Sequence, residues 1–210
     1  SHLSHEKAKE IITVIKSINQ ELHVHTAILA DLQGPKIRVG AFEKPITLKK
    51  GAELSLSNDQ KEEKAIFINY SNFAKDVKKG DRILLDDGKI ALKVSQLISE
   101  KTIKAKVIFG GRLYSNKGVS LPDTEISLPY LTKKDKKDLA FILGEKIEWI
   151  GLSFVRRAED IVKLKKIIRK KKTSNARVIA KIEKPEAITD IDNIITQADA
   201  VMVARGDLGV

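Results

Sequence analysis

The stretch that decides the fold is RVIAKIEKPEAITDIDNIITQADAVMVARGDLG, residues 177–209. It contains two short apolar runs, Val178–Ala180 and Ala200–Val203, and charged residues follow each of them. A segment of helical character, Pro185–Gln197, separates the two runs, so the pattern predicts a strand, a helix and a second strand. Because a crossover of this length makes the two strands parallel neighbours, both charged groups are expected at the same carboxyl edge of one sheet.

Three charged residues at this edge are expected to lie close together, namely Lys181, Glu183 and Asp207. Lys181 and Glu183 are two positions apart in an extended segment, which places them on the same side. Gly206, just before Asp207, lets backbone N–H groups approach an anion. Two carboxylates and an ammonium group at parallel strand ends suit a divalent cation and a phosphorylated or enolic substrate. The alternative is that each residue is a solvated loop charge.

The composition is that of a globular protein without thiol chemistry. The chain has 210 residues, of which 42% are hydrophobic, enough for one core or two small domains. It has no cysteine, which excludes a disulfide framework and a thiolate metal site. No apolar run approaches the roughly 18 residues of a membrane span, so we expect no membrane association.

The net charge of +11 raises the question of a nucleic-acid partner. The main basic run, 163–172, lies in a segment whose apolar residues recur at helical spacing, which leaves the lysines on a solvent-exposed face. Aromatic residues do not alternate with the basic ones, as they do in proteins that stack single-stranded bases. We therefore expect no nucleic-acid binding.

The hydrophobic pattern predicts an α/β fold that a small all-β domain interrupts. Residues 1–34 read as a helix and a buried strand, and residues 128–210 alternate helix and strand, which indicates a parallel sheet. Residues 35–127 instead hold short alternating segments between turn sequences, typical of a small β-barrel or sandwich. The expected elements of the flanking regions are helix Glu6–Leu22, strand Thr26–Asp31, a helix from Thr132 to about Leu143, strand Trp149–Ser153, helix Ala158–Lys171 and strand Arg177–Ile182.

The chain begins with Ser1 and its one methionine is Met202, inside an apolar run. We therefore expect an internal fragment of a longer polypeptide, inactive by itself because a sheet that is cut at this point would expose an unpaired edge.

Seven blocks of sequence, in order and with matching spacing, carry a resemblance to a known family. They are Ser1-His2, AILADLQGPKIRVG at 27–40, LLDDGKIALKV at 84–94, NKGVSLP at 116–122, LSFVRRAED at 152–160, AKIEKPEAI at 180–188 and MVARGDLGV at 202–210. Together they resemble pyruvate kinase over essentially the whole chain. The resemblance implies strands three to six of a TIM-type (β/α)8 barrel, the A domain, interrupted after its third strand by a mobile B domain. It also implies a cytoplasmic enzyme of glycolysis, a homotetramer when full length.

The implied reaction is phosphoryl transfer from phosphoenolpyruvate to ADP, giving pyruvate and ATP. By resemblance, Glu183 and Asp207 hold Mg²⁺ or Mn²⁺, while Lys181 and Arg38 face the phosphoryl group. The backbone of Gly206 and Asp207 would bind the substrate carboxylate, and His2 and Lys117 would bind the nucleotide. The block that contains Asp86 would close over the site, and Arg205 would contact another subunit.

The segment Asp31–Lys36 departs from the pattern of many family members, which need K⁺. In those members K⁺ is bound at positions that correspond to Ser1, Asp31 and Leu32. Members with Gly-Pro-Lys, as here, generally do without K⁺, and the ammonium group of Lys36 can supply the same positive charge beside the phosphates. We therefore expect activity that does not require K⁺.

Two other functions stay open at this point. Aldolases and lyases of the wider phosphoenolpyruvate/pyruvate barrel group also hold Mg²⁺ against an enolate, although they lack a β-rich insertion after strand three. The second possibility is a non-catalytic, basic module that binds RNA or polyphosphate.

Overall fold

The computed structural model describes residues 3–171 and 174–208, and the chain divides into two compact units. The first, called the α/β unit, comprises residues 3–35 and Pro129–Leu208. The second, called the β unit, is Lys36–Leu128. Each unit has its own cluster of buried apolar residues.

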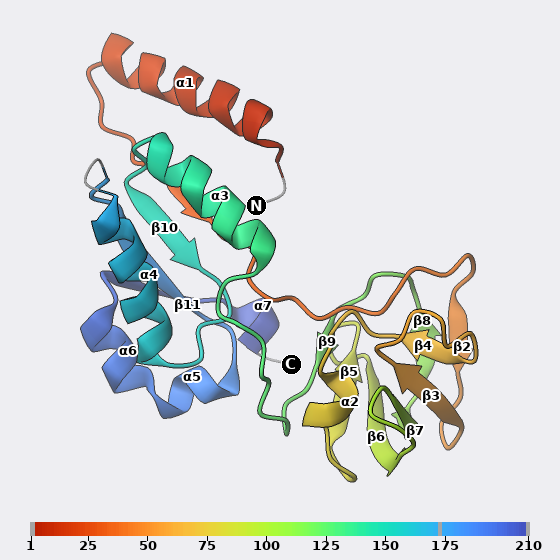
Figure 1. Ribbon diagram of the computed structural model, residues 1–210. Helices are drawn as coiled ribbons and strands as arrows, with labels where there is room; N and C mark the ends of the chain where they lie inside the picture. Colours follow the sequence, from red (N-terminus) through yellow and green to blue (C-terminus); the bar gives the residue numbers. More distant parts are fainter. Residues whose placement is uncertain (1–2, 172–173, 209–210) are drawn as a thin grey trace. The chain divides into compact units, whose positions relative to one another are not determined.

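The α/β unit is built on a four-stranded parallel sheet in the order β1-β10-β11-β12, of which Figure 1 labels the two central strands, β10 and β11. Its strands are β1 (Leu29–Asp31), β10 (Trp149–Leu152), β11 (Arg177–Ile182) and β12 (Ala200–Val203). The strands lie side by side in their order along the chain, and the β unit is inserted between β1 and β10. The expectation that β11 and β12 are parallel neighbours is confirmed, with Ile182 opposite Val203. All four strands therefore end at the same edge.

Helices precede, connect and follow these strands. They are α1 (His5–Glu21), α3 (Lys133–Gly144), α4 (Ala158–Lys170), α5 (Pro185–Thr189), α6 (Ile191–Gln197) and α7 (Arg205–Leu208). The expected cap of α3 is confirmed: Thr132 and Asp135 form a reciprocal capping box. In α4, Ile161, Leu164 and Ile168 are buried, whereas most of the basic side chains are exposed, as the helical spacing predicts.

Two predicted elements of this unit are corrected. The single helix expected over Pro185–Gln197 is two helices, because the carboxylate of Asp190 accepts hydrogen bonds from the Ala158 amide at 2.7 Å and from Asn193 at 2.6 Å. The carboxylate of Asp190 thereby stabilises the N-terminus of α4, and the helix expected to run through Asp190 is interrupted there. The strand expected from Thr26 begins at Leu29, since the backbone of Thr26 bonds to the side chain of Asn19 instead.

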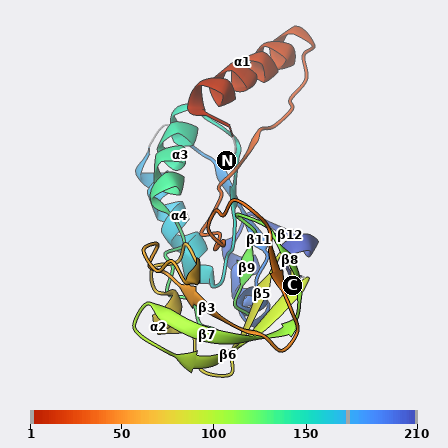
Figure 2. The same ribbon diagram turned by 90° about the vertical axis from the view of Figure 1, so that its right-hand side faces the viewer.

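The β unit contains a six-stranded sheet, in the order β4-β3-β7-β6-β5-β9, and a two-stranded antiparallel sheet of β2 and β8. Figure 2 shows the long strands β6 and β7 side by side. Its elements are β2 (Ile46–Leu48), β3 (Glu53–Ser57), β4 (Ala65–Phe67), α2 (Phe73–Asp76), β5 (Arg82–Leu85), β6 (Ile90–Leu97), β7 (Thr102–Phe109), β8 (Gly111–Leu113) and β9 (Val119–Ser120). The sequence did not reveal α2, β8 or β9, which are each four residues or shorter.

Within residues 3–171 and 174–208, no helix has both the length and the apolar character that crossing a membrane requires.

Candidate active site

Four polar side chains meet at the carboxyl edge of the parallel sheet, and we call Asp31, Ser153, Lys181 and Glu183 the strand-end cluster. Asp31 ends β1, Ser153 follows β10, and Lys181 and Glu183 flank the last residue of β11; these three strands are adjacent. The Lys181 ammonium nitrogen lies 3.2 Å from the Asp31 carboxylate, 2.9 Å from the Ser153 hydroxyl and 3.0 Å from Glu183 Oε1. The predicted meeting of Lys181 and Glu183 is therefore observed.

The environment of Lys181 keeps it positively charged. Its side chain is 14% exposed. Burial by itself disfavours the charged form, but the hydrogen bonds and negative charges of Glu183 and Asp31 outweigh it and raise the pKa of Lys181 above its ordinary value. At neutral pH the cluster thus presents a fixed ammonium group.

The carboxylate of Glu183 is held from two sides. It is 2% exposed, and its Oε1 contacts Lys181. Its Oε2 accepts a hydrogen bond of 2.8 Å from the backbone N–H of Phe154. Because each carboxylate oxygen has two lone pairs, both can accept a further partner. An anionic oxygen donor of this type fits Mg²⁺ or Mn²⁺.

The second predicted metal ligand, Asp207, is described only through its backbone. It lies in α7, which begins two residues after β12 ends. The Ala204 amide bonds to the Ile182 carbonyl at 3.1 Å, so α7 starts at the edge that carries Lys181. Among the side chains that the structure describes, no group of three His, Asp or Glu residues could hold a metal ion. The metal role of Asp207 stays a prediction, and Ser1 and His2 lie outside the described residues.

The β unit brings together the other predicted residues, and we call Lys36, Arg38, Asp86 and Lys117 the turn cluster. Two distant segments, 36–39 and 116–119, run antiparallel, with hydrogen bonds of 2.9 Å from Val39 N to the Lys117 carbonyl and from Val119 N to the Ile37 carbonyl.

Arg38 and Lys36 are positioned by this pairing. The Arg38 guanidinium donates to the Asn116 carbonyl at 2.8 Å, and its backbone N–H donates to Asn69 at 2.7 Å. The Lys36 side chain passes Gly118, where an added Cβ would lie 3.8 Å from Lys36 Cε.

Lys117 and Asp86 form an ion pair of 2.8 Å that the sequence did not predict, although it singled out both residues. Asp86 lies in the turn between β5 and β6, with a φ of 51°, and its side chain is 8% exposed. The hydrogen bond and charge of Lys117 hold the pKa of Asp86 below its ordinary value despite burial. Asp86 in turn raises the pKa of Lys117.

Sequence reasoning missed Ser153 and Phe154 as parts of the site. Ser153 directly follows β10 at the same edge, so the rule that singled out Lys181 also applies to it. For Phe154 the chain carries no such signal, because its backbone N–H makes the contact. Asp31, which the resemblance links to K⁺, contacts Lys181, and Leu32 is fully buried.

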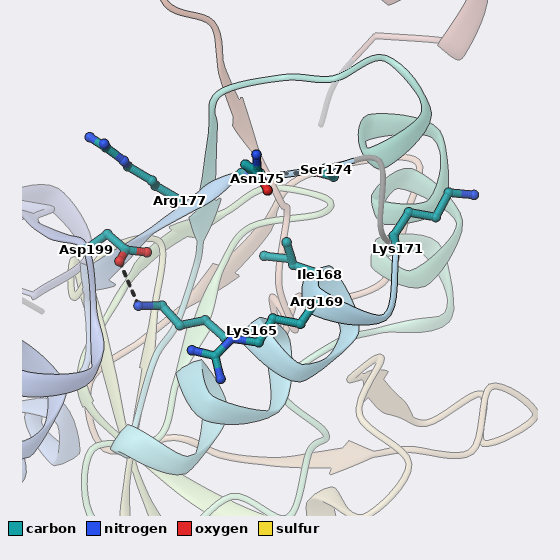
Figure 3. A pocket seen from close by; sticks show the side chains of 9 residues that line it. Lys165, Ile168, Arg169, Lys171, Ser174, Asn175, Arg177 and Asp199 are labelled. Carbon is teal, nitrogen blue, oxygen red and sulfur yellow. Dashed lines mark hydrogen bonds and ion pairs between the residues drawn. The ribbon is translucent and has the colours of Figure 1, made fainter.

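A pocket of about 470 Å³ lies at the opposite edge of the sheet, where β11 begins (Figure 3). In this pocket Lys165 and Asp199 form an ion pair of 2.8 Å. Figure 3 shows Arg177 and Lys171 pointing in opposite directions, so the basic groups do not converge on one point. The pocket is separate from the strand-end cluster. It is lined by Lys165, Ile168, Arg169, Lys171, Ser174, Asn175, Ala176, Arg177 and Asp199.

Comparisons with known proteins agree over the whole chain. The family "Pyruvate kinase, barrel domain" matches residues 1–210. Pyruvate kinase from Methylorubrum extorquens is 41% identical over all of this chain, which covers 44% of that relative. Pyruvate kinase 2 from Synechocystis sp. is 44% identical, with 100% of this chain and 36% of the relative covered. Pyruvate kinase from Corynebacterium glutamicum is 41% identical, with 100% and 44% covered.

The chain thus spans between 36% and 44% of the length of these curated relatives. The match includes both the parallel sheet that carries Lys181 and the inserted β unit that carries Arg38. The sheet is accordingly part of a β/α barrel. The chain belongs to the pyruvate kinase family.

Proposed function

We propose that this chain carries the phosphoryl-transfer residues of a pyruvate kinase, which transfers the phosphoryl group of phosphoenolpyruvate to ADP and yields pyruvate and ATP, the last step of glycolysis. The observation that carries the proposal is the Lys181 ammonium group, held by Asp31, Ser153 and Glu183 at the carboxyl edge of the parallel sheet. In β/α barrels this edge is where active sites lie. The names of the relatives support the same reaction.

Phosphoryl transfer needs positioning and charge neutralisation more than covalent chemistry from the protein. Lys181 would place a positive charge beside the transferring phosphoryl group. Because three oxygen partners already hold its ammonium group, little reorganisation is needed as negative charge moves during the reaction.

Glu183, with Asp207, would hold Mg²⁺ or Mn²⁺. When bound, the metal supplies positive charge that bridges and neutralises phosphoryl and enolate oxygens. The protein's part is to hold the Glu183 carboxylate in a fixed orientation. Lys181 and the Phe154 N–H do this from two sides.

Arg38 would bind phosphate oxygens through its guanidinium group, whose planar donors match them better than a lysine does. The backbone N–H groups of Gly206 and Asp207, in α7, would bind the substrate carboxylate. Lys117 and His2 would contact the nucleotide. In this proposal residues 1–34 and 128–210 belong to the A domain, residues 35–127 form the B domain, and the complete protein is a cytoplasmic homotetramer.

We also propose that the activity does not require K⁺. The support is Lys36, whose ammonium group would supply positive charge near the phosphates. An assay of the complete protein that contains these 210 residues, with K⁺ or with tetramethylammonium, tests this. We expect less than about a twofold difference, and a tenfold rise on adding K⁺ would contradict it.

The reaction itself is tested by following pyruvate formation from phosphoenolpyruvate by the complete protein, with ADP and Mg²⁺. We expect pyruvate and ATP in equal amounts. Glu183→Gln should lower the rate at least about a hundredfold, whereas Glu159→Gln, an exposed carboxylate in α4, should leave it unchanged. Pyruvate formed without ADP, or no pyruvate at all, would overturn the proposed function.

A further inference from the structure

Phe154 has an unusual backbone conformation directly beside Glu183. Its φ is +56°, in the left-handed region that bulky residues rarely adopt. Its N–H donates the 2.8 Å hydrogen bond to Glu183 Oε2, and this bond is buried. Strained residues of this kind persist when the surroundings hold them in place, and they gather at functional sites.

Gly34 provides the space in which Phe154 and Ser153 lie. A Cβ added at Gly34 would be 2.8 Å from Phe154 Cδ2 and 3.1 Å from the carbonyl oxygen of Ser153, closer than ordinary contacts. Gly34 also has a φ of +70°, which a larger residue would adopt only with strain. Any side chain here would push the segment that supplies the N–H to Glu183.

Gly34 is itself fixed from the other side. Its N–H donates to Asp135 Oδ1 at 3.2 Å, and Asp135 is fully buried. Asp135 Oδ2 accepts the Thr132 N–H at 2.9 Å and thereby closes the capping box of α3. The N-terminus of α3 therefore holds Gly34, Gly34 accommodates Phe154, and Phe154 holds Glu183.

We propose that Gly34 and Phe154 position the Glu183 carboxylate to bind a divalent cation. This inference rests on the proposed function, because it concerns the metal ligand of the same site. Phe154 is a positioning residue that acts through Glu183. With one oxygen held by the Phe154 N–H and the other by Lys181, the carboxylate plane cannot rotate, and the second lone pairs of both oxygens keep fixed directions.

The test is the affinity for Mn²⁺ alone, measured on the complete protein by electron paramagnetic resonance without substrate. Groups that orient a metal ligand typically contribute about 10- to 100-fold to metal affinity. We therefore expect Gly34→Ala to raise the Kd for Mn²⁺ at least about tenfold. Phe154→Gly, which removes the ring but keeps the N–H and tolerates a positive φ, should raise it by about threefold.

The double variant Gly34→Ala/Phe154→Gly separates this route from general damage. Without the ring, the methyl group at position 34 loses its nearest neighbour but keeps its close contact with Ser153, so the Kd should lie between those of Phe154→Gly and Gly34→Ala alone. Two matched controls are available. An added Cβ meets nothing within 4 Å at Gly51, which has a φ of +85°, or at Gly144. Gly51→Ala therefore tests backbone strain alone, and Gly144→Ala tests the substitution itself.

Folding is monitored by far-UV circular dichroism and by the fluorescence of Trp149, which lies in β10 and is the single tryptophan of these 210 residues. If Gly34→Ala lowers Tm but binds Mn²⁺ with the Kd of the parent, the inference is overturned. A double variant whose Kd for Mn²⁺ is as high as that of Gly34→Ala overturns it too. If Gly34→Ala does not fold, Phe154→Gly decides: an unchanged Kd overturns the inference. A parent that binds Mn²⁺ without forming pyruvate overturns the proposed function only, whereas a parent that binds no Mn²⁺ overturns the inference as well.

Discussion

The two clusters of charged residues are built in different ways. In the strand-end cluster, side chains leave the ends of adjacent parallel strands, so sheet register determines their spacing. In the turn cluster, residues with positive φ determine the arrangement, such as Asp86 at 51° and Asn116 at 61°. The lysines differ accordingly: the Lys181 side chain is 14% exposed, whereas that of Lys117 is 39% exposed.

This difference indicates a division of work. Charges held by a sheet ladder in a largely buried site interact strongly and move little, which suits groups that face changing charge during a reaction. Charges on turns are solvated and adaptable, which suits substrate binding. We therefore expect substitutions in the strand-end cluster to lower kcat and those in the turn cluster to raise KM.

The largest effect is expected for Lys181→Met in the complete protein. The variant removes the ammonium group and leaves Glu183 with the Phe154 N–H. Because a preorganised charge is lost, kcat should fall about a thousandfold. The matched control is Lys165→Met, which removes another lysine paired with an aspartate, at the opposite sheet edge. Pyruvate formation measures both, and a loss below tenfold for Lys181→Met would break the comparison.

Arg38→Lys tests the turn cluster. A lysine keeps the charge but loses the guanidinium fork that bonds to the Asn116 carbonyl. We expect KM for phosphoenolpyruvate to rise between about tenfold and a hundredfold, with kcat changed less than fivefold. Arg112→Lys, at an exposed arginine of the same unit, is the control. A fall in kcat with an unchanged KM would place Arg38 among the reacting charges instead.

Ser153→Ala should have a smaller effect within the strand-end cluster. It removes one of three partners of Lys181, and Asp31 and Glu183 stay in place. The loss of a single hydrogen bond to a charged group corresponds to about a tenfold fall in kcat. Steady-state kinetics measure it, and a loss as large as that of Lys181→Met would show that Ser153 has a direct role.

The smallest effect concerns pH and the pair of Asp86 and Lys117. Because the pKa of Asp86 is lowered in the folded protein, the pair's stabilisation is present above the unfolded pKa and is lost as pH falls through the folded value. Asp86→Asn should thus lower the free energy of unfolding of the β unit by about 1 kcal/mol or less at pH 7, and the difference from the parent should shrink as the pH falls below the unfolded pKa of the carboxyl group.

Urea denaturation followed through the amide signals of β6 and β7 measures this difference. Asp87→Asn is the control, since Asp87 is an exposed neighbour that also has a positive φ, of 55°. A difference between Asp86→Asn and the parent that persists at low pH would show that packing and not charge is responsible.

Much of the fold follows from local sequence patterns. The strands β11 and β12 have the predicted bounds, because their apolar runs end at clear charge signals. The errors arise where a side chain competes for backbone groups. Asp190 breaks a helix by bonding to Ala158, and Asn19 shortens β1 by bonding to Thr26. Such long-range or side-chain competition leaves no periodic pattern in the sequence.

The site is predictable where strand topology governs it. The contact of Lys181 with Glu183 follows from their spacing after a strand. The pairing of Lys117 with Asp86 depends on two turns far apart in the sequence, and the Phe154 N–H is a backbone group whose direction depends on a positive φ. Neither feature is encoded in residue type or spacing.

The most direct test of the central claim is the position of Mn²⁺ in crystals of the complete protein soaked with Mn²⁺ and a phosphoenolpyruvate analogue. We predict an anomalous scattering peak at about 2.0 to 2.3 Å from a Glu183 carboxylate oxygen, with the analogue beside the Lys181 ammonium group. Two results would contradict the assignment of the metal and the reacting charges to the strand-end cluster. One is a peak at Asp86 in the turn cluster, and the other is a peak elsewhere while Glu183 contacts only Lys181 and Phe154.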